Sequence, residues 1–280
     1  MEDAELYAIS SAMQKRDASA AMATFIGEME IKPGERILDI GCGTGEITRG
    51  LLAEWLSSAS EIVGVDISWT MIEFARKFCT FPNLNGPNVV YKQMDIERTI
   101  EPRMLFPEGF DKIFSFYCLH WTTDLRQVLD NIYDLLKPGG ETFLVFLAQN
   151  PIFTMYELMS YKPDWKEYMK DVSNFVPRTH YLKNPAEYFA QMALESKFDV
   201  RSCSTIEKSF LFENINHVRS EYAVRAVNPF TQRIPPALQE FFIQDCLQTL
   251  QEITGPAKNG KMTANYKLMT AHFRKTALSP

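Results

Sequence analysis

The chain has 280 residues, 46% of them hydrophobic, which is enough apolar material for one large core. A net charge of −6 without any basic run argues against nucleic acid as a partner. Its five cysteines form no C-x-x-C pair, and no stretch of about 20 residues is apolar enough to span a membrane. We therefore expect a cytoplasmic protein without a signal peptide, a membrane span or a disulfide framework.

The first half of the chain alternates between helix and strand patterns. Residues 4–30 mix apolar and charged residues, which predicts a helical segment ending before Pro33-Gly34. Apolar runs bounded by turn residues predict strands at 37–40, 61–66, 89–94, 110–117 and 141–148. Between them we expect helices at 45–57, 68–79 and 123–136, and a turn at 137–140. Ser68 is the expected N-cap of the second of these helices, and Thr123 or Asp124 that of the third. The alternation predicts a parallel sheet covered by helices on both faces.

This alternation stops after Asn150-Pro151. Residues 151–183 are crowded with aromatic residues and methionines, which indicates an insertion after the fifth strand. A helix near 185–196 and a strand near 200–206 resume the earlier rhythm. Residues 212–253 predict further helices broken by prolines, and residues 265–274 predict a last strand.

The most informative stretch is a glycine-rich turn after the first strand. Gly41, Gly43 and Gly45 stand at alternate positions shortly after Asp39, and a helix is expected to follow. Glycines let a backbone turn sharply and approach a ligand closely. No Lys follows the glycines, which excludes a P-loop. Their spacing also differs from the G-x-G-x-x-G of dinucleotide-binding folds, although a dinucleotide-binding fold stays an alternative. This D-x-G-x-G-x-G turn resembles motif I of the class I S-adenosylmethionine-dependent methyltransferases.

The resemblance implies S-adenosyl-L-methionine as the cofactor, bound beyond the carboxyl ends of the parallel strands. Asp66 would accept hydrogen bonds from the ribose hydroxyls, and Asp95 from the adenine amino group. The alternative is that these acids only cap helices or turns. The expected cofactor-binding residues are Asp39, Gly41, Cys42, Gly43, Gly45, Asp66, Ile67, Asp95, Ile96 and Phe116.

A second cluster follows the fourth predicted strand. His120-Trp121 resembles the His-Trp pair of the juvenile hormone acid O-methyltransferase family of arthropods. Leu6-Tyr7 and Gln14-Lys15-Arg16-Asp17 match the opening segment of that family in type and position. Tyr7 and Gln14 are about two helical turns apart and therefore share one face. The resemblance is specific over residues 1–150 and vaguer beyond them.

The family resemblance implies methylation of a sesquiterpenoid acid, farnesoic acid or juvenile hormone acid, to its methyl ester. A carboxylate is ionised at neutral pH and needs no general base, only alignment with the methyl group. Gln14 and Trp121 are neutral donors that could hold the other carboxylate oxygen, so the expected catalytic residues are Gln14, His120 and Trp121. The expected substrate-binding residues are Tyr7, Gln14, Tyr117, Trp121, Phe153 and Tyr156.

The resemblance also implies how the chain is divided. We expect a seven-stranded, mostly parallel Rossmann-like sheet in a single methyltransferase domain over residues 1–280. Within it we expect a helical segment over the site at 1–30, a cofactor-binding core at 35–150, aromatic-rich helical cap insertions at 151–183 and 207–258, and a last strand at 263–275.

Other interpretations stay open at this point. Trp121 could be a core aromatic, Gln14 a solvated helix residue, and His120 a structural residue or the base for a hydroxyl acceptor. The acceptor could be a fatty acid, an amine or a tricarboxylate, for which Arg178, Arg219 and Arg225 are candidate cations. The chain could also bind the cofactor without turnover. No metal site is expected, because the remaining histidines show no ligand spacing: His180, His217 and His272.

Overall fold

The computed structural model describes residues 3–80, 86–212, 224–255 and 261–277, and these form a seven-stranded sheet with strand order β3-β2-β1-β4-β5-β7-β6. Every neighbouring pair from β3 to β5 is parallel, and β7 pairs antiparallel with both β5 and β6. The predicted fold class is therefore confirmed. The strands are β1 (Arg36–Ile40), β2 (Glu61–Asp66), β3 (Asn88–Gln93), β4 (Phe110–Phe116), β5 (Leu136–Gln149), β6 (Phe198–Phe212) and β7 (Met262–Lys275).

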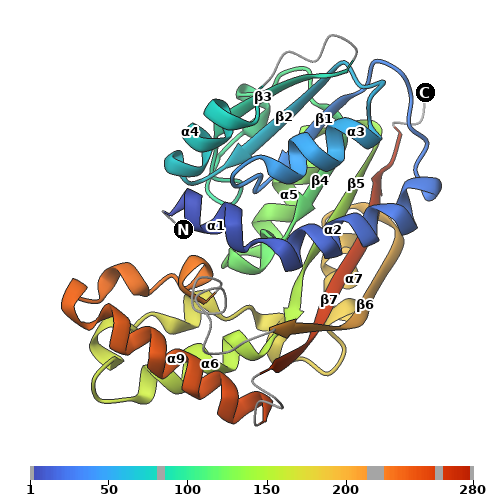
Figure 1. Ribbon diagram of the computed structural model, residues 1–280. Coiled ribbons are helices and arrows are strands. Elements are labelled where there is room, and N and C mark those ends of the chain that lie inside the picture. The colour runs from blue at the N-terminus through green and yellow to red at the C-terminus, as the bar shows by residue number, and fades with distance from the viewer. Residues whose placement is uncertain (1–2, 81–85, 213–223, 256–260, 278–280) are drawn as a thin grey trace.

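Helices cover both faces of this sheet, and more of them follow β5 and β6 (Figure 1). The α-helices are α1 (Ala4–Ser10), α2 (Ala12–Phe25), α3 (Ala53–Trp55), α4 (Trp69–Phe78), α5 (Leu125–Leu135), α6 (Pro151–Tyr161), α7 (Pro185–Glu195) and α9 (Gln239–Thr254). Shorter helical turns are η1 (Ile26–Glu28), η2 (Thr48–Leu52), η3 (Pro102–Met104), η4 (Leu119–Trp121), η5 (Lys166–Tyr168), η6 (Val172–Phe175), η7 (Arg178–Tyr181), η8 (Thr231–Arg233) and η9 (Pro236–Leu238).

Capping side chains fix where several helices begin. The expected caps are confirmed, since Ser68 accepts a hydrogen bond from the Met71 amide and Asp124 accepts one from the Gln127 amide. Such caps satisfy amides that have no partner within the helix. Asn150 caps α6 in the same way, with Pro at the first helical position.

The structure corrects four of the expected boundaries. The helical segment at 4–30 divides at Ser11 into α1 and α2, and α2 ends at Phe25. Residues 137–140, expected as a turn, bulge within β5: Leu136 pairs with Phe110 and Glu141 with Lys112, so the ladder continues around them. The expected strand at 200–206 is part of the longer β6. Residue 212 is strand rather than helix, and the next eleven residues of the expected 212–253 helices lie outside the described part of the chain.

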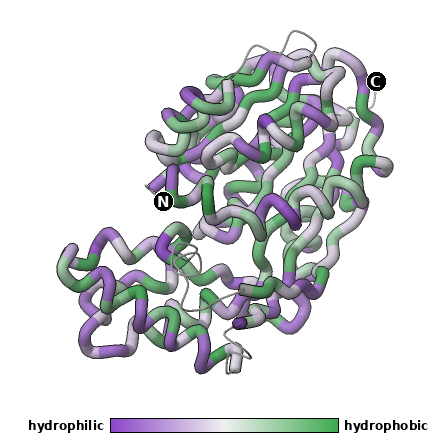
Figure 2. The backbone as a smooth tube through the Cα atoms, in the orientation of Figure 1, coloured by the Kyte–Doolittle hydropathy of each residue, from purple (hydrophilic) through white to green (hydrophobic). Residues whose placement is uncertain are grey.

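Two apolar cores lie on opposite faces of the sheet, and hydrophobic backbone stretches run through its interior in Figure 2. The core on one face contains buried residues of α2, such as Met22 and Phe25, and continues into α6 and α9. On the other face the core contains the apolar residues of α5 and α7, including Phe189. The helices after β5 and β6 therefore share a core with the sheet instead of forming a separate one. No helix in the described ranges is long and apolar enough to cross a bilayer.

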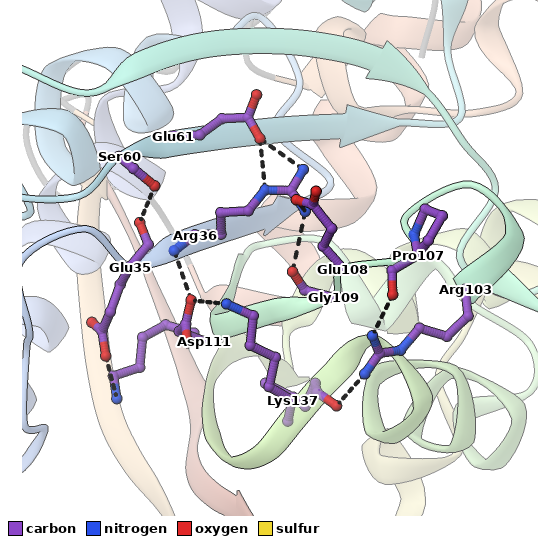
Figure 3. Close-up of polar contacts among 12 residues, drawn as sticks. Glu35, Arg36, Ser60, Glu61, Arg103, Pro107, Glu108, Gly109, Asp111 and Lys137 are labelled. Atoms are coloured by element: carbon purple, nitrogen blue, oxygen red, sulfur yellow. Dashed lines mark hydrogen bonds and ion pairs between the residues drawn. The ribbon is translucent and has the colours of Figure 1, made fainter.

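Charged side chains pair at the amino ends of the parallel strands (Figure 3). Arg36 bridges to Glu61 at 2.7 Å, and the Lys137 ammonium donates to Asp111 at 2.6 Å. Deeper in, the Lys112 ammonium lies 2.8 Å from Glu141, with both side chains almost fully buried. Ion pairs therefore connect the strands at their amino ends, whereas the predicted site residues lie at the carboxyl ends.

Candidate functional site

The glycine turn after β1 needs glycine for steric reasons. Gly41 has φ of +72°, and a Cβ there would lie 2.3 Å from the Sγ of Cys118. Gly45 has φ of +80°, and its Cβ would lie 2.7 Å from the Tyr91 hydroxyl oxygen. Gly43 also has positive φ, of +53°. An L-residue would be strained at each of these conformations, so the alternate spacing follows from the shape of the turn.

Asp39 lies behind this turn and is 1% exposed. Its Oδ2 accepts a 2.6 Å hydrogen bond from the Thr48 hydroxyl. Burial raises the pKa of Asp39 to about 7, the Thr48 hydrogen bond opposes this rise, and the nearby charge of Asp66 adds to it. Asp39 therefore braces the first turn of the following helix from inside the protein.

Asp66 and Asp95 lie at the carboxyl ends of β2 and β3, as predicted. Asp66 accepts hydrogen bonds from the amides of Gly43, at 2.9 Å, and Ser68, at 2.8 Å. A carboxylate has about four lone-pair sites, so Asp66 keeps acceptor capacity for a ligand. Asp95 accepts from two amides of the next turn with one oxygen. Ile67 is 63% exposed beside Asp66, whereas Ile96 is buried.

A hollow beside the glycine turn brings several of the predicted cofactor residues together. It is lined by Gly41, Cys42 and Phe116 and reaches Asp39. Burial raises the pKa of the Cys42 thiol well above its usual range, and the charge of Asp66 adds to this. Cys42 is therefore a neutral wall of the hollow. Tyr7 of α1 also lines the hollow.

A second cavity of about 110 Å³ lies next to this hollow and is mainly apolar. Its lining includes the predicted catalytic residues Gln14, His120 and Trp121 and the predicted substrate residues Tyr7, Tyr117 and Phe153. Tyr7 lines both the hollow and the cavity. Tyr156, also predicted to bind substrate, is fully buried away from the cavity, and its hydroxyl donates to the Val227 carbonyl at 3.0 Å.

Two polar side chains that line this cavity, His120 and Gln14, are uncharged. His120 is 3% exposed, and burial lowers its pKa to about 3, so its imidazole is neutral at physiological pH. Its Nδ1 and the Oε1 of Gln14 have no hydrogen-bond partner among the described residues. Trp121 is half-buried and lies against His120, with the ring centroids 4.9 Å apart. Unpartnered buried polar atoms are unusual in folded proteins, and both of these residues line the cavity.

Sequence reasoning missed one part of the site. Tyr117 has φ of +57°, and its hydroxyl donates to the buried Asp17 of α2 at 2.6 Å. The Tyr266 hydroxyl on β7 donates to the same carboxylate, and Arg16 forms an ion pair with it at 2.9 Å. The Gln-Lys-Arg-Asp stretch contains Arg16 and Asp17, but nothing in it points to two distant tyrosines.

No Lys or Arg is among the described residues that line the cavity. Arg178 stacks over Tyr188 with 5.2 Å to the ring centroid, and Arg225 forms an ion pair with Glu240 at 3.0 Å. Arg219 and His217 lie outside the described residues. Within the described ranges, no group of three or more His, Cys, Asp or Glu residues could hold a metal ion.

Comparisons with known proteins agree with this geometry. A methyltransferase-domain family matches residues 37–140. The juvenile hormone acid O-methyltransferase of Drosophila melanogaster is 31% identical, over 99% of this chain and 93% of that protein. The Bombyx mori enzyme of the same name is 28% identical, over 100% and 99% of the two chains. The chain belongs to the juvenile hormone acid O-methyltransferase family.

Solved structures support the same fold for this member of the juvenile hormone acid O-methyltransferase family. The Bacillus subtilis YcgJ protein superposes with a TM-score of 0.56 at 18% identity, covering 92% of this chain and 99% of its own. Haemonchus contortus phosphoethanolamine N-methyltransferase 2, solved with S-adenosylhomocysteine, gives 0.52 at 20% identity, covering 94% of this chain and 53% of its own. At these identities the likeness concerns the fold alone.

As a member of the juvenile hormone acid O-methyltransferase family, the chain is an S-adenosylmethionine-dependent O-methyltransferase, and S-adenosyl-L-methionine is its cofactor. The residues present fit this cofactor. Asp66 has spare acceptor capacity at the carboxyl end of β2. Lys15 is the only cation among the described residues that line the hollow, and its ammonium is paired with Glu46 at 2.8 Å. Uncharged and acidic walls suit a positively charged sulfur.

Proposed function

We propose that this enzyme transfers the methyl group of S-adenosyl-L-methionine to the carboxylate of a sesquiterpenoid acid, farnesoic acid or juvenile hormone acid. One observation carries the proposal: a mainly apolar cavity is lined by the uncharged polar side chains of Gln14 and His120, and it shares Tyr7 with the hollow beside the glycine turn. The names of the Drosophila and Bombyx relatives support the same substrate class.

The chain's own residues would bind and orient the two reactants. We propose that Asp66 accepts hydrogen bonds from the ribose hydroxyls and that Asp95 and Ile96 contact the adenine. The glycine turn, with Cys42 and Phe116, would hold the methionyl part. Ile67 would cover the nucleoside from outside, where its side chain is 63% exposed. The bound cofactor supplies an electrophilic methyl group on a positively charged sulfur.

The acceptor requires orientation rather than deprotonation. A carboxyl group with an ordinary pKa of about 4 is already ionised at neutral pH. We propose that Gln14 and Trp121 donate hydrogen bonds to one carboxylate oxygen, so that the other oxygen faces the methyl group in line at about 3–3.5 Å. Neutral His120 would lie against this group without adding charge. The rings of Tyr7, Tyr117 and Phe153 would surround the hydrocarbon chain.

Neutral donors suit this reaction better than a cation. An Arg or Lys would orient the acid, but it would also stabilise the ground-state charge and weaken the nucleophile. Attack of an anion on a sulfonium disperses charge, so an apolar pocket favours the transition state over the separated ions. The absence of Lys and Arg from the described cavity lining favours an apolar monoacid over a tricarboxylate.

A methyl-transfer assay with radiolabelled cofactor tests the proposal. Purified enzyme should methylate farnesoic and juvenile hormone acids and show much lower kcat/KM for fatty acids, tricarboxylic acids and amines. Gln14→Ala should lower kcat/KM for the preferred acid about 10- to 100-fold and leave the Kd of the cofactor nearly unchanged. Preferred turnover of a tricarboxylate or an amine would refute the substrate class. Tight cofactor binding without transfer to any acid would instead indicate a binding protein.

We further propose how the chain is divided around this chemistry. Residues 1–30 would cover the site, residues 35–150 would bind the cofactor, and a last strand would follow at 263–275. Residues 151–183 would form the cap around the substrate together with the described residues 224–255 of the predicted 207–258 insertion, because residues 207–212 belong to β6. The protein would act in the cytoplasm.

A further inference from the structure

A buried carboxylate of α2 joins elements that are far apart in the sequence. Asp17 is 1% exposed. Its Oδ2 accepts hydrogen bonds from the Tyr117 hydroxyl, at 2.6 Å, and from the Tyr266 hydroxyl. Its Oδ1 accepts from the Arg16 Nε at 3.0 Å. Hydrogen bonds to a charged group are stronger than neutral ones, so this single side chain ties α2 to the end of β4 and to β7.

Two of these contacts, those with Tyr117 and Arg16, lead to walls of the acceptor cavity, which is the mainly apolar cavity lined by Gln14, His120 and Trp121. Gln14 precedes Asp17 by three residues on α2, so both lie on the same helical face. Tyr117 lines the cavity with its ring. The Arg16 guanidinium lies over Phe210, a third lining residue, at 5.2 Å from the ring centroid. Asp17 is therefore connected to Tyr117 by a hydrogen bond, to Phe210 through Arg16, and to Gln14 through the α2 backbone.

The backbone at Tyr117 adds to this picture. A non-glycine residue with φ of +57° is strained and persists only where its surroundings hold it. The hydroxyl of Tyr117 is held by Asp17 while its backbone leads directly into η4, which carries His120 and Trp121. The hydrogen bond between the Tyr117 hydroxyl and Asp17 therefore influences the orientation of η4.

Docking α2 on the sheet does not by itself require a charge. Ala18, Met22 and Phe25 already bury the apolar face of this helix in the core. Asp17 instead lies one helical turn after Gln14 on α2, where it can influence the position of the Gln14 side chain in the cavity. This placement favours a role in positioning over a role in packing alone.

We propose that Asp17 is a positioning residue that fixes Gln14 and Tyr117 relative to each other, so that the acceptor carboxylate is held in line with the methyl group. The inference rests on the proposed function. It predicts that the Asp17 carboxylate contributes to kcat for the acid through Gln14 and contributes little to cofactor binding.

A double-mutant cycle with Asp17→Asn and Gln14→Ala tests this. Asp17→Asn should lower kcat for farnesoic acid about 10- to 100-fold, because a small misplacement of a reacting group costs this much, with KM changed less. If Asp17 acts through Gln14, the double variant should lose no more than the more affected single variant. Tyr117→Phe keeps the ring and removes one donor, so it should give a smaller loss of the same kind.

Tyr181→Phe is the matched control, because it also deletes a hydrogen bond from a tyrosine to a carboxylate, that of Glu157 on the outer surface. It should leave kcat unchanged. The Kd of the cofactor, measured by calorimetry, should be the same in all variants. If Asp17→Asn does not fold, the kcat of Tyr117→Phe for farnesoic acid tests the positioning role instead. Multiplying losses in the double variant, or lower stability with unchanged kcat, would overturn the positioning role alone. A wild-type enzyme without turnover of any acid would refute the proposed function, and this inference with it.

Discussion

The two ends of the parallel strands use polar residues in opposite ways. At the amino ends, ionised side chains neutralise one another, as Lys112 does with Glu141 at 2.8 Å and with Glu35 at 3.4 Å. At the carboxyl ends, the acceptor cavity is bordered by neutral groups, and two of these, on Gln14 and His120, lack partners among the described residues. The amino ends therefore hold ion pairs between protein side chains, although Glu35 Oε2 lacks a hydrogen-bond partner there, and we propose that ligands complete the carboxyl ends.

This difference follows from what each end must do. The amino ends receive the chain from loops, and the charges there are paired with one another, so that removing one partner would be costly. The carboxyl ends of an open parallel sheet form the crevice where ligands bind. Asp66 illustrates the second case, since the backbone uses only two of its acceptor positions. Substitutions at the two ends should therefore separate stability from chemistry.

The largest effect should come from breaking the buried charge cluster at the amino ends. Lys112→Met would leave Glu35 and Glu141 without their shared cation in a buried place. Removing one partner of a buried ion pair costs about 3–5 kcal/mol of stability, measurable by urea unfolding. Lys137→Met is the control: its ion pair with Asp111 is more exposed, so the loss should stay below about 1 kcal/mol. A change in kcat per folded molecule in either variant would contradict the separation of the two ends.

At the carboxyl ends, Asp66→Ala should weaken binding of S-adenosyl-L-methionine more than any other single change. Loss of two hydrogen bonds to a charged acceptor should cost about 3 kcal/mol, more than a hundredfold in Kd by calorimetry. Asp111→Ala makes the same change at the amino ends and should leave this Kd unaltered. If Asp66→Ala bound the cofactor as tightly as wild type, Asp66 would have no place in the cofactor site.

Trp121→Phe should act on the acceptor alone. It keeps an aromatic ring beside His120 but removes the indole donor proposed to hold the carboxylate. We expect a loss of about 1.5–3 kcal/mol in transition-state stabilisation, or about 10- to 100-fold in kcat/KM for farnesoic acid. Trp165→Phe deletes an indole donor that bonds Asp245 at 2.7 Å between the helices after β5 and β6, and should lower stability without this kinetic effect. Equal kinetics in both variants would remove Trp121 from the carboxylate contact.

Sequence patterns predicted the features that are local in the chain. The glycine turn and the acids at the strand ends could be placed because strand, turn and helix follow each other within a few residues. The Lys137–Gly140 bulge was missed because Pro and Gly mark a turn and a bulge equally well. The acceptor residues came from the family resemblance, since periodicity alone does not bring Gln14 near Trp121.

Contacts between distant residues could not be predicted in this way. Asp17 and Tyr266 are 249 positions apart, and only the folded sheet brings them together. Tyr156 shows a related limit: a dense aromatic segment predicts burial, but not which rings face a cavity and which face the core. Cavity lining depends on side-chain direction in the folded state, and a single sequence carries little information about this.

The last prediction is that the stability contributions of two carboxylates, one at each end of the strands, depend on pH with opposite signs. Burial alone would raise the pKa of Glu141, but its contacts with His272 and Lys112 outweigh this and lower the pKa to about 2, from an ordinary 4.5. The unfolded chain therefore binds the proton more tightly, and stability from Glu141 is lost as pH falls from 4.5 toward 2. Asp39 behaves oppositely. Its pKa is raised from 3.8 to about 7, so the folded state binds the proton more tightly and stability falls as pH rises through that range.

Unfolding free energies of wild type, Glu141→Gln and Asp39→Asn, measured between about pH 3.5 and 8, would test these signs. The Gln and Asn variants cannot titrate and serve as each other's controls. Relative to wild type, Glu141→Gln should become less destabilising as the pH is lowered below 4.5, by about 1–2 kcal/mol over the accessible range. Asp39→Asn should become more favourable as the pH is raised toward 7. For each variant, the difference in unfolding free energy from wild type is plotted against pH. Slopes of the same sign for the two variants would contradict the prediction, because opposite pKa shifts of Glu141 and Asp39 must give slopes of opposite sign.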